Sequence, residues 1–110
     1  MTKINFTIID DQNLLKINEE KLYEAIKLLS SLDGEELDLT LIYINDEEIT
    51  KLNKDFLNHE GPTDVLSFPM GPGEGEIIVS VETALREAKN RNINVEGEIL
   101  LYTIHGILHL

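Results

Sequence analysis

Hydrophobic residues recur along this chain with two alternating periods, and this alternation constrains the fold more than any other feature. In residues 3–9 and 37–44, apolar side chains stand at every second position, which is the period of a β-strand. The segments that begin at Asn18 and Asn45 carry apolar side chains three and four positions apart, the spacing of an amphipathic helix. The expected order is strand 3–9, a helix from Asn18, strand 37–44, a helix from Asn45 or Asp46, strands 65–68 and 76–79, a helix from Ser80, and a helix from Val95.

The boundaries of these elements follow from residues that cap or break secondary structure. Asparagine and serine side chains at the expected helix starts accept hydrogen bonds from free backbone N–H groups. We expect the first helix to end before Gly34, and the second to end around residues 58–62, where Gly61 and Pro62 interrupt the helical pattern. The two short strands are close enough to form a hairpin, and the glycine-rich residues 69–75 between them are expected to be flexible.

The length and the element order together predict the fold class. A chain of 110 residues can bury one core but is too short for two domains, so residues 1–110 are interpreted as a single domain. Two strands, each followed by a helix, then a hairpin and two more helices predict an α+β fold: a small mixed sheet of about four strands packed against helices. The pattern does not reveal which strands are neighbours.

Composition restricts the chemistry available to the chain. It has no cysteine, so a transition-metal site must be built from histidine and carboxylate, and the histidines are His59, His105 and His109. The formal net charge of −12 counts against a broad nucleic-acid surface, although a bound cation and a few local basic residues can still approach phosphates.

Basic residues gather in two places. One group comprises Lys51 and Lys54, and the other comprises Arg86, Lys89 and Arg91. Each group is either a solvated helix face or a local site for phosphate. The N-terminus has no basic segment followed by an apolar stretch, and no segment approaches the roughly 18 apolar residues that span a bilayer. These features predict a cytoplasmic protein without a membrane partner.

His105 and His109 are four residues apart in a predicted helix, so their rings should lie on one face and reach a single ion. The neighbouring residues Ile104, Ile107, Leu108 and Leu110 predict a dry, apolar setting for that ion. By spacing alone, the pair is also compatible with ordinary packed or exposed histidines. The H-E-x-x-H motif of zinc proteases is excluded, because Gly106 stands where its glutamate would be.

Several neighbouring residues have two interpretations each. Gly106 inside a helix indicates either close approach of a substrate or another backbone, or tight helix packing. Glu98 is either a carboxylate that hydrogen-bonds a ligand imidazole and orients it, or an exposed carboxylate at a helix start. His59 is either a third ligand or a surface-loop histidine. The chain ends within an apolar helical run that has no C-cap, so we expect the third ligand to follow Leu110.

Three motifs together resemble a known family. They are T-D-V-L-S-F-P at residues 63–69, G-E-I-I-V-S at 75–80 and H-G-I-L-H-L at 105–110, with Leu52-Asn53 at the place of a family L-N pair. In order and spacing, they are similar to the motifs of the YbeY endoribonuclease family, whose last motif continues as H-G-x-L-H-L-x-G-Y-D-H.

The resemblance implies a metal cleft at the C-terminal helix that holds one zinc ion. His105 and His109 would be the first two ligands, and the third histidine would come six residues after His109. The implied activity is single-strand-specific, zinc-dependent RNA hydrolysis in 16S rRNA maturation and ribosome quality control. The implied partners are the small-subunit rRNA precursor and the small ribosomal subunit, with no DNA.

Other positions bear on this expectation. Leu57 stands where the family usually has an arginine for RNA binding and cleavage, and Lys54 is a candidate replacement for its charge. Thr63, Asp64 and Ser67 are candidates for the substrate cleft, or else they satisfy backbone groups at a turn and a strand start. Two further functions stay open: a noncatalytic ribosome-associated binding module, and a metal-dependent hydrolase of another substrate.

Overall fold

The strands and helices occur in the order that the sequence predicts. The computed structural model describes residues 3–29, 36–61 and 63–110. The elements are β1 (Ile4–Asp10), α1 (Glu19–Leu29), β2 (Leu37–Ile44), α2 (Asp46–Leu57), β3 (Val65–Gly71), β4 (Glu74–Ser80), α3 (Val81–Arg91) and α4 (Val95–Leu108). The predicted α+β class and the predicted mixed sheet are confirmed.

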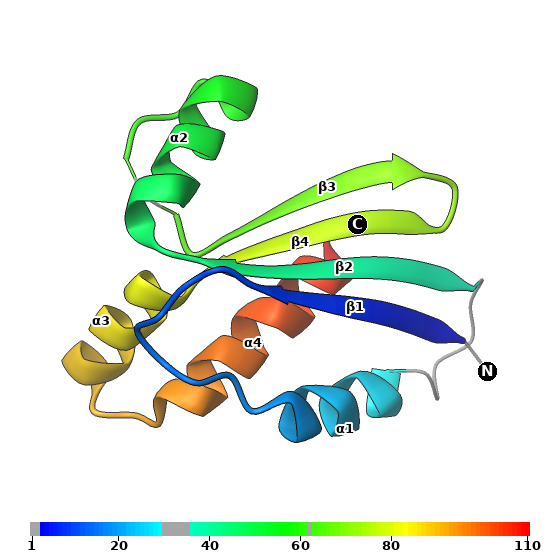
Figure 1. Cartoon of the computed structure of the whole chain (residues 1–110), viewed down its shortest axis with the longest axis horizontal. Helices are drawn as coiled ribbons and strands as arrows, with labels where there is room; N and C mark the ends of the chain where they lie inside the picture. The colour runs from blue at the N-terminus through cyan, green and yellow to red at the C-terminus, as the bar shows by residue number, and fades with distance from the viewer. Residues whose placement is uncertain (1–2, 30–35, 62) are drawn as a thin grey trace.

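One four-stranded sheet has the spatial order β1-β2-β4-β3, which the sequence pattern had not revealed (Figure 1). Strands β1, β2 and β4 are parallel, and β3 pairs antiparallel with β4 at one edge. Strand β2 lies inside the sheet, and this is why both of its faces carry apolar residues: Leu41 and Tyr43 on one face, Ile42 and Ile44 on the other.

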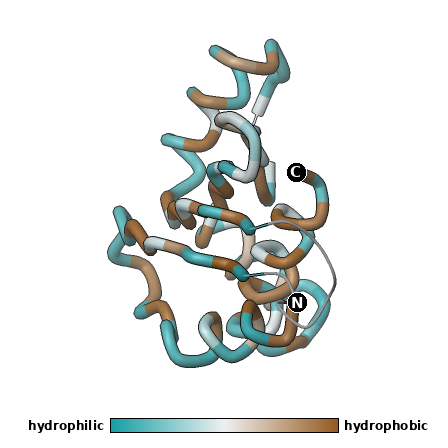
Figure 2. Tube along the Cα trace, turned by 90° about the vertical axis from the view of Figure 1, so that its right-hand side faces the viewer, coloured by the Kyte–Doolittle hydropathy of each residue, from teal (hydrophilic) through white to brown (hydrophobic). Residues whose placement is uncertain are grey.

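Helices cover the two faces of the sheet unequally. The larger core joins one face to α1, α3 and α4, and the smaller core joins the other face to α2. Figure 2 shows the same arrangement from the side, with α2 on one side of the strands and the other helices opposite. The larger core consists of Ile17, Leu22, Ile26, Leu39, Leu41, Tyr43, Ile77, Val79, Val81, Ala84, Ile99, Tyr102 and Ile107.

The predicted helix caps form. Asn18 Oδ1 accepts from Lys21 N at 3.2 Å, and Ser80 Oγ accepts from Thr83 N at 3.1 Å. At the start of α2 the cap is Asn45, whose side chain accepts from the N–H of residue 48. Helix α2 ends at Leu57 with Asn58 as its left-handed C-cap, so the predicted end around residues 58–62 is confirmed. The predicted end of the first helix before Gly34 lies outside the described residues.

The hairpin is confirmed, but the expected flexible stretch at 69–75 is wrong. Strand β3 continues to Gly71 and β4 starts at Glu74, so only two residues form the turn. Gly71 (φ 143°) and Gly73 (φ 73°) supply backbone conformations that other residues rarely adopt. Pro69 is tolerated within β3 because this strand lies at the edge of the sheet.

Candidate functional site

The imidazoles of His105 and His109 lie side by side at the end of α4. Their ring centroids are 4.5 Å apart and their planes are inclined by 45°. The N–H of His109 donates to the main-chain oxygen of His105 at 3.2 Å, so the helical turn continues through the second histidine. The predicted shared face is confirmed. Two ring nitrogens on successive turns suit a single divalent cation.

The predicted dry, apolar setting of this pair is wrong. Both histidines are exposed, Leu108 is 64% exposed, and Leu110 is 38% exposed. Helix α4 turns its other side into the core, where Ile99 and Ile107 are buried. The histidine side of the helix therefore faces outward.

The pair supplies two of the three protein ligands that a catalytic zinc usually takes. Among residues 3–29, 36–61 and 63–110, no three histidine, aspartate or glutamate side chains are grouped closely enough to hold a metal. His59, the alternative third ligand, is exposed in the loop after α2 and joins no such group. The chemistry and spacing of the two imidazoles fit zinc, and the ligand expected after Leu110 stays a prediction.

Close packing explains the glycine between the two histidines. A Cβ added at Gly106 would lie 2.6 Å from Ile77 Cγ2 and 3.0 Å from Val65 Cγ2, both on the sheet. Ser67 Oγ donates to the main-chain oxygen of Gly106 at 2.8 Å. Of the two interpretations of Gly106, tight helix packing is the one that these contacts support. Ser67, a predicted cleft residue, thus anchors the histidine helix to β3.

A second bond holds α4 deeper in the core. Thr103 Oγ1 donates to the carbonyl of Ile99 at 2.8 Å and lies 2.8 Å from Tyr43 Oη. Because the threonine proton is used, the tyrosine hydroxyl donates to Thr103. Burial raises the pKa of Tyr43 to about 12, which keeps this donor protonated at neutral pH. Strand β2 and the sheet edge together fix the position of α4.

Thr63 and Asp64 have a structural role, and they also face the same groove as His105. Asp64 Oδ1 accepts from Val65 N at 2.8 Å and from Thr63 Oγ1 at 3.3 Å. Ser80 N donates to the Asp64 main-chain oxygen at 3.0 Å. These bonds are the strand-start chemistry that was one interpretation of the two residues. Their place in the groove keeps the other interpretation, substrate contact, open.

The groove lies between α3, α4 and the segment before β3, and it is open to solvent, with a volume of about 520 Å³. Figure 1 shows α3 and α4 side by side beneath the sheet. The lining residues are Thr63, Asp64, Thr83, Arg86, Glu87, Arg91, Leu101, Tyr102 and His105. This is the place where the structure brings a candidate metal ligand together with two predicted cleft residues.

Two arginines of α3 line the groove, and each pairs with a carboxylate. Arg86 Nη1 lies 2.8 Å from Asp46 Oδ2, and Arg91 pairs closely with Glu98. Asp46 also accepts from Ser80 Oγ and Thr83 Oγ1, both at 2.6 Å. Burial disfavours the charged form of Asp46, but the hydrogen bonds from Ser80, Thr83 and Arg86 outweigh it and lower its pKa.

Glu98 is not an exposed carboxylate, and that interpretation is corrected. Only 2% of its surface is accessible. Within the described part of the chain its partners are Arg91 and Tyr102, rather than either imidazole of α4. Burial, followed by the bond to Glu98, raises the pKa of Tyr102, so the phenol stays protonated. The guanidinium of Arg91 compensates the charge of this buried carboxylate.

Lys54 and Leu57 belong to a different part of the molecule. Both are exposed on α2, which packs on the opposite face of the sheet from α4 (Figure 1). Neither is among the described residues that line the groove. The basic side chains that do line it, Arg86 and Arg91, were recognised in the sequence only as a cluster of charge. Arg86 follows Thr83 by about one helical turn, and Arg91 follows Glu87 in the same way. This spacing could have indicated that the four residues share one face of the helix.

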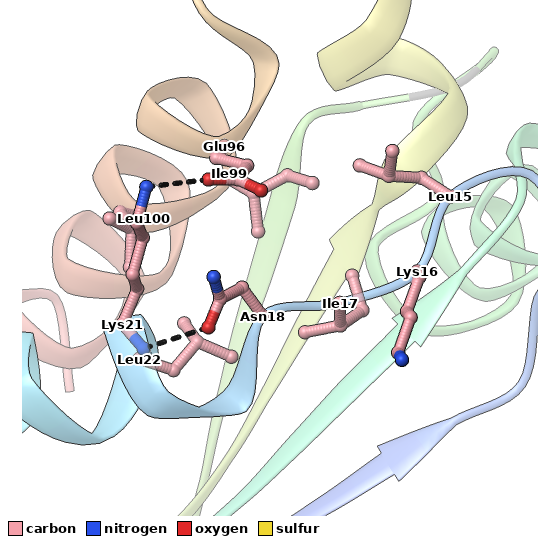
Figure 3. A pocket seen from close by; sticks show the side chains of 9 residues that line it. All are labelled: Leu15, Lys16, Ile17, Asn18, Lys21, Leu22, Glu96, Ile99 and Leu100. Carbon is pink, nitrogen blue, oxygen red and sulfur yellow. Dashed lines mark hydrogen bonds and ion pairs between the residues drawn. The ribbon is translucent and has the colours of Figure 1, made fainter.

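A separate cavity beside α1 is too small to bind substrate. It has a volume of about 10 Å³, room for about one water molecule. Figure 3 shows its mostly apolar lining, crossed by the ion pair between Lys21 Nζ and Glu96 Oε2 at 2.7 Å. This contact connects α1 to the first turn of α4 and is structural.

The family model described as Endoribonuclease YbeY matches residues 7–110. The chain belongs to the Endoribonuclease YbeY family. The match includes the hairpin, the groove and the histidine pair, and it confirms the resemblance carried by the three motifs. Membership supports an endoribonuclease role with RNA as substrate.

Individual relatives agree with the family match. The chain is 35% identical to an Endoribonuclease YbeY of Syntrophus aciditrophicus, over 94% of this chain and 71% of that one. It is 42% identical to one of Picosynechococcus, over 81% of this chain and 61% of that one. The solution structure of TM1509 from Thermotoga maritima superposes with a TM-score of 0.66 at 28% identity, over 100% of this chain and 71% of that one. No helix in the described part of this chain is long and apolar enough to cross a membrane.

Proposed function

We propose that this protein is a metal-dependent endoribonuclease that cuts single-stranded RNA, with His105 and His109 as two of its metal ligands. One observation carries the proposal: the two imidazoles lie 4.5 Å apart, and His105 also lines the groove that contains Thr63 and Asp64. An open groove beside a pair of potential ligands admits an extended strand more readily than a small molecule that needs enclosure.

The proposed metal is zinc, held by the two imidazoles and by a third histidine six residues after His109, as the family resemblance implies. When bound, such an ion polarises a phosphoryl oxygen and lowers the pKa of a coordinated water. The chain's own residues position the reaction. Ser67 and Gly106 fix the histidine turn against the sheet, and Asp64, itself held by Val65 N, borders the groove.

The proposed cellular role is maturation of 16S rRNA and ribosome quality control in the cytoplasm, with the small ribosomal subunit as partner. The chain spans 71% of the length of the Syntrophus relative and 61% of the Picosynechococcus one. An open groove can bind the sugar-phosphate backbone of an extended RNA strand. Single-stranded RNA suits such a groove because its bases are unpaired and can turn away from one another.

A noncatalytic ribosome-associated binding module is the second candidate. Leu57, 44% exposed at the place of the family arginine, favours it, as does the net charge of −12. A bound cation and the groove arginines would have to offset that charge for catalysis. Hydrolysis of another substrate by the same centre is a third outcome that an assay can separate.

The test is cleavage of a labelled RNA in single-stranded and duplex forms by the protein expressed from its full reading frame. We expect cleavage of the single strand alone, loss of cleavage after chelation, and recovery with added zinc. RNA binding without cleavage under all metal conditions would support the binding module instead. Cleavage that survives chelation would contradict the proposed metal dependence.

A further inference from the structure

Helix α3 presents one continuous face to the groove. Thr83, Glu87 and Arg91 follow one another at four-residue steps, and Arg86 is adjacent to this row. All four line the groove that also contains His105. An RNA strand that reaches His105 along this groove therefore passes Arg86 and Arg91.

Each arginine is oriented with its charge toward solvent and its counter-ion behind it. The Arg86 side chain is 47% exposed, against 20% for Asp46. The Arg91 side chain is 52% exposed, against 2% for Glu98. The partly buried Asp46 and the buried Glu98 hold the two guanidinium groups, which line the groove and are about half exposed.

The arginines retain hydrogen-bonding capacity. Arg86 donates to Asp46 and Thr83, and Arg91 donates to Glu98. A planar guanidinium carries more N–H donors than these bonds use, and its fork matches two oxygens of a phosphate group. Pre-positioned donors lose little side-chain entropy when a phosphate binds.

Two carboxylates face the same groove and oppose an anion. Asp64 is engaged by Val65 N and Thr63 Oγ1, which partly satisfies its charge. Glu87 is half-buried in the groove, and its charge acts on Arg86: the hydrogen bond and charge of Asp46, and more weakly the charge of Glu87, raise the pKa of Arg86. The affinity of the groove for an anion thus depends on Arg86 and Arg91, with Glu87 acting against them.

We propose that Arg86 and Arg91 bind backbone phosphates of the RNA strand and direct it toward His105. This inference rests on the proposed function, since it names the residues that hold the substrate of the same site. It assigns the positive charge of the site to α3, whereas the sequence had suggested α2 through Lys54. The expected contacts are to phosphate, so they favour no particular base.

The first test is binding of a fluorescent single-stranded RNA by anisotropy, in a buffer with a chelator so that affinity is measured without cleavage. Arg86→Gln and Arg91→Gln are compared with Lys89→Gln, which removes the same charge from an exposed site on α3 outside the groove. We expect each arginine variant to bind roughly five- to tenfold more weakly, and the slope of log K against log salt to fall by about 0.7. Lys89→Gln should bind like the wild type. Equal affinity of the arginine and lysine variants, or no binding by the wild type, would overturn the proposal.

A second comparison does not disturb either ion pair. Glu87→Gln removes the opposing charge from the groove, and Glu24→Gln removes the same charge from an exposed site on α1. We expect Glu87→Gln to bind RNA severalfold more tightly than Glu24→Gln, and an equal affinity would overturn the inference even if the arginine variants fail to fold. Arginine-dependent binding without metal-dependent cleavage would refute only the proposed function. Cleavage by arginine variants at the wild-type rate and affinity would refute only this inference.

Discussion

Ser67 on the edge strand donates a 2.8 Å hydrogen bond to the main-chain oxygen of Gly106 on the histidine helix. In a regular helix, the Gly106 oxygen would accept from Leu110 N. At this end of α4, Leu110 N donates to Ile107 O instead, so the Gly106 oxygen lacks its usual helical donor. Ser67, from the T-D-V-L-S-F-P motif, therefore supplies the hydrogen bond that the backbone of the H-G-I-L-H-L motif lacks. The hydrogen bond joins two motifs whose bonded residues are 39 positions apart in the sequence, so that the motifs act as one structural unit.

Ser67→Ala should loosen this unit. The substitution leaves the Gly106 carbonyl without its partner at a partly buried site, which costs about 1 kcal/mol of unfolding free energy. Urea denaturation measures the loss. An unchanged midpoint with an unchanged slope would show that the bond does not hold α4 in place.

Gly106→Ala should destabilise the protein, whereas Gly97→Ala in the same helix should not. A methyl group at Gly106 meets Ile77 Cγ2 at 2.6 Å, while nothing lies within 4 Å of the same group at Gly97. Overpacking against the sheet costs about 1–3 kcal/mol, and alanine at an open helical site gains about 0.5–1 kcal/mol. Thermal unfolding of both variants measures the contrast. Equal melting temperatures would contradict the close approach.

Tyr43→Phe should flatten the loss of stability at alkaline pH. The pKa of Tyr43 is raised from 10.0 to about 12 by burial in the folded chain, so the neutral phenol stabilises the fold fully below pH 10. That contribution is lost as pH rises from 10 to about 12, where the unfolded phenol ionises first. Unfolding free energies across this range measure it. Tyr23→Phe, at an exposed position, is the control and should retain the wild-type slope.

Asp46→Asn should reduce the sensitivity of the fold to acid. Hydrogen bonds from Ser80, Thr83 and Arg86 outweigh burial and hold the pKa of Asp46 below its ordinary 3.8. The ionised carboxylate therefore stabilises the fold above that pH, and the stabilisation disappears as pH falls through the lower folded-state value. Urea unfolding between about pH 6 and pH 3 tests this, with the exposed Asp55→Asn as control. A wild-type acid slope in Asp46→Asn would contradict the network.

The order of elements could be predicted from the sequence because each element buries one face and carries its own cap. Asn18 and Ser80 marked helix starts that the structure confirms. The order of the strands could not be predicted, because it depends on contacts between residues far apart in the chain. The extent of the hairpin was missed because Pro69 and its neighbouring glycines suggest a loop, whereas an edge strand accommodates them.

For the candidate site too, the sequence predicted what depends on local spacing and missed what depends on contacts between distant elements. The pairing of His105 with His109 depends on helical spacing alone, which the sequence contains. Burial of Glu98 depends on Arg91, which arrives from another helix, and exposure of His105 depends on which side of α4 the sheet covers. Such facts belong to the packing of elements and leave little trace in local spacing.

The proposed function places the reactive metal centre at His105 and His109 on α4. Its most direct test compares His105→Ala with His59→Ala, a histidine exposed in a loop outside any candidate metal group, in zinc-dependent cleavage of single-stranded RNA. We expect His105→Ala to abolish cleavage and His59→Ala to retain the wild-type rate. Wild-type cleavage by a folded His105→Ala protein would contradict it.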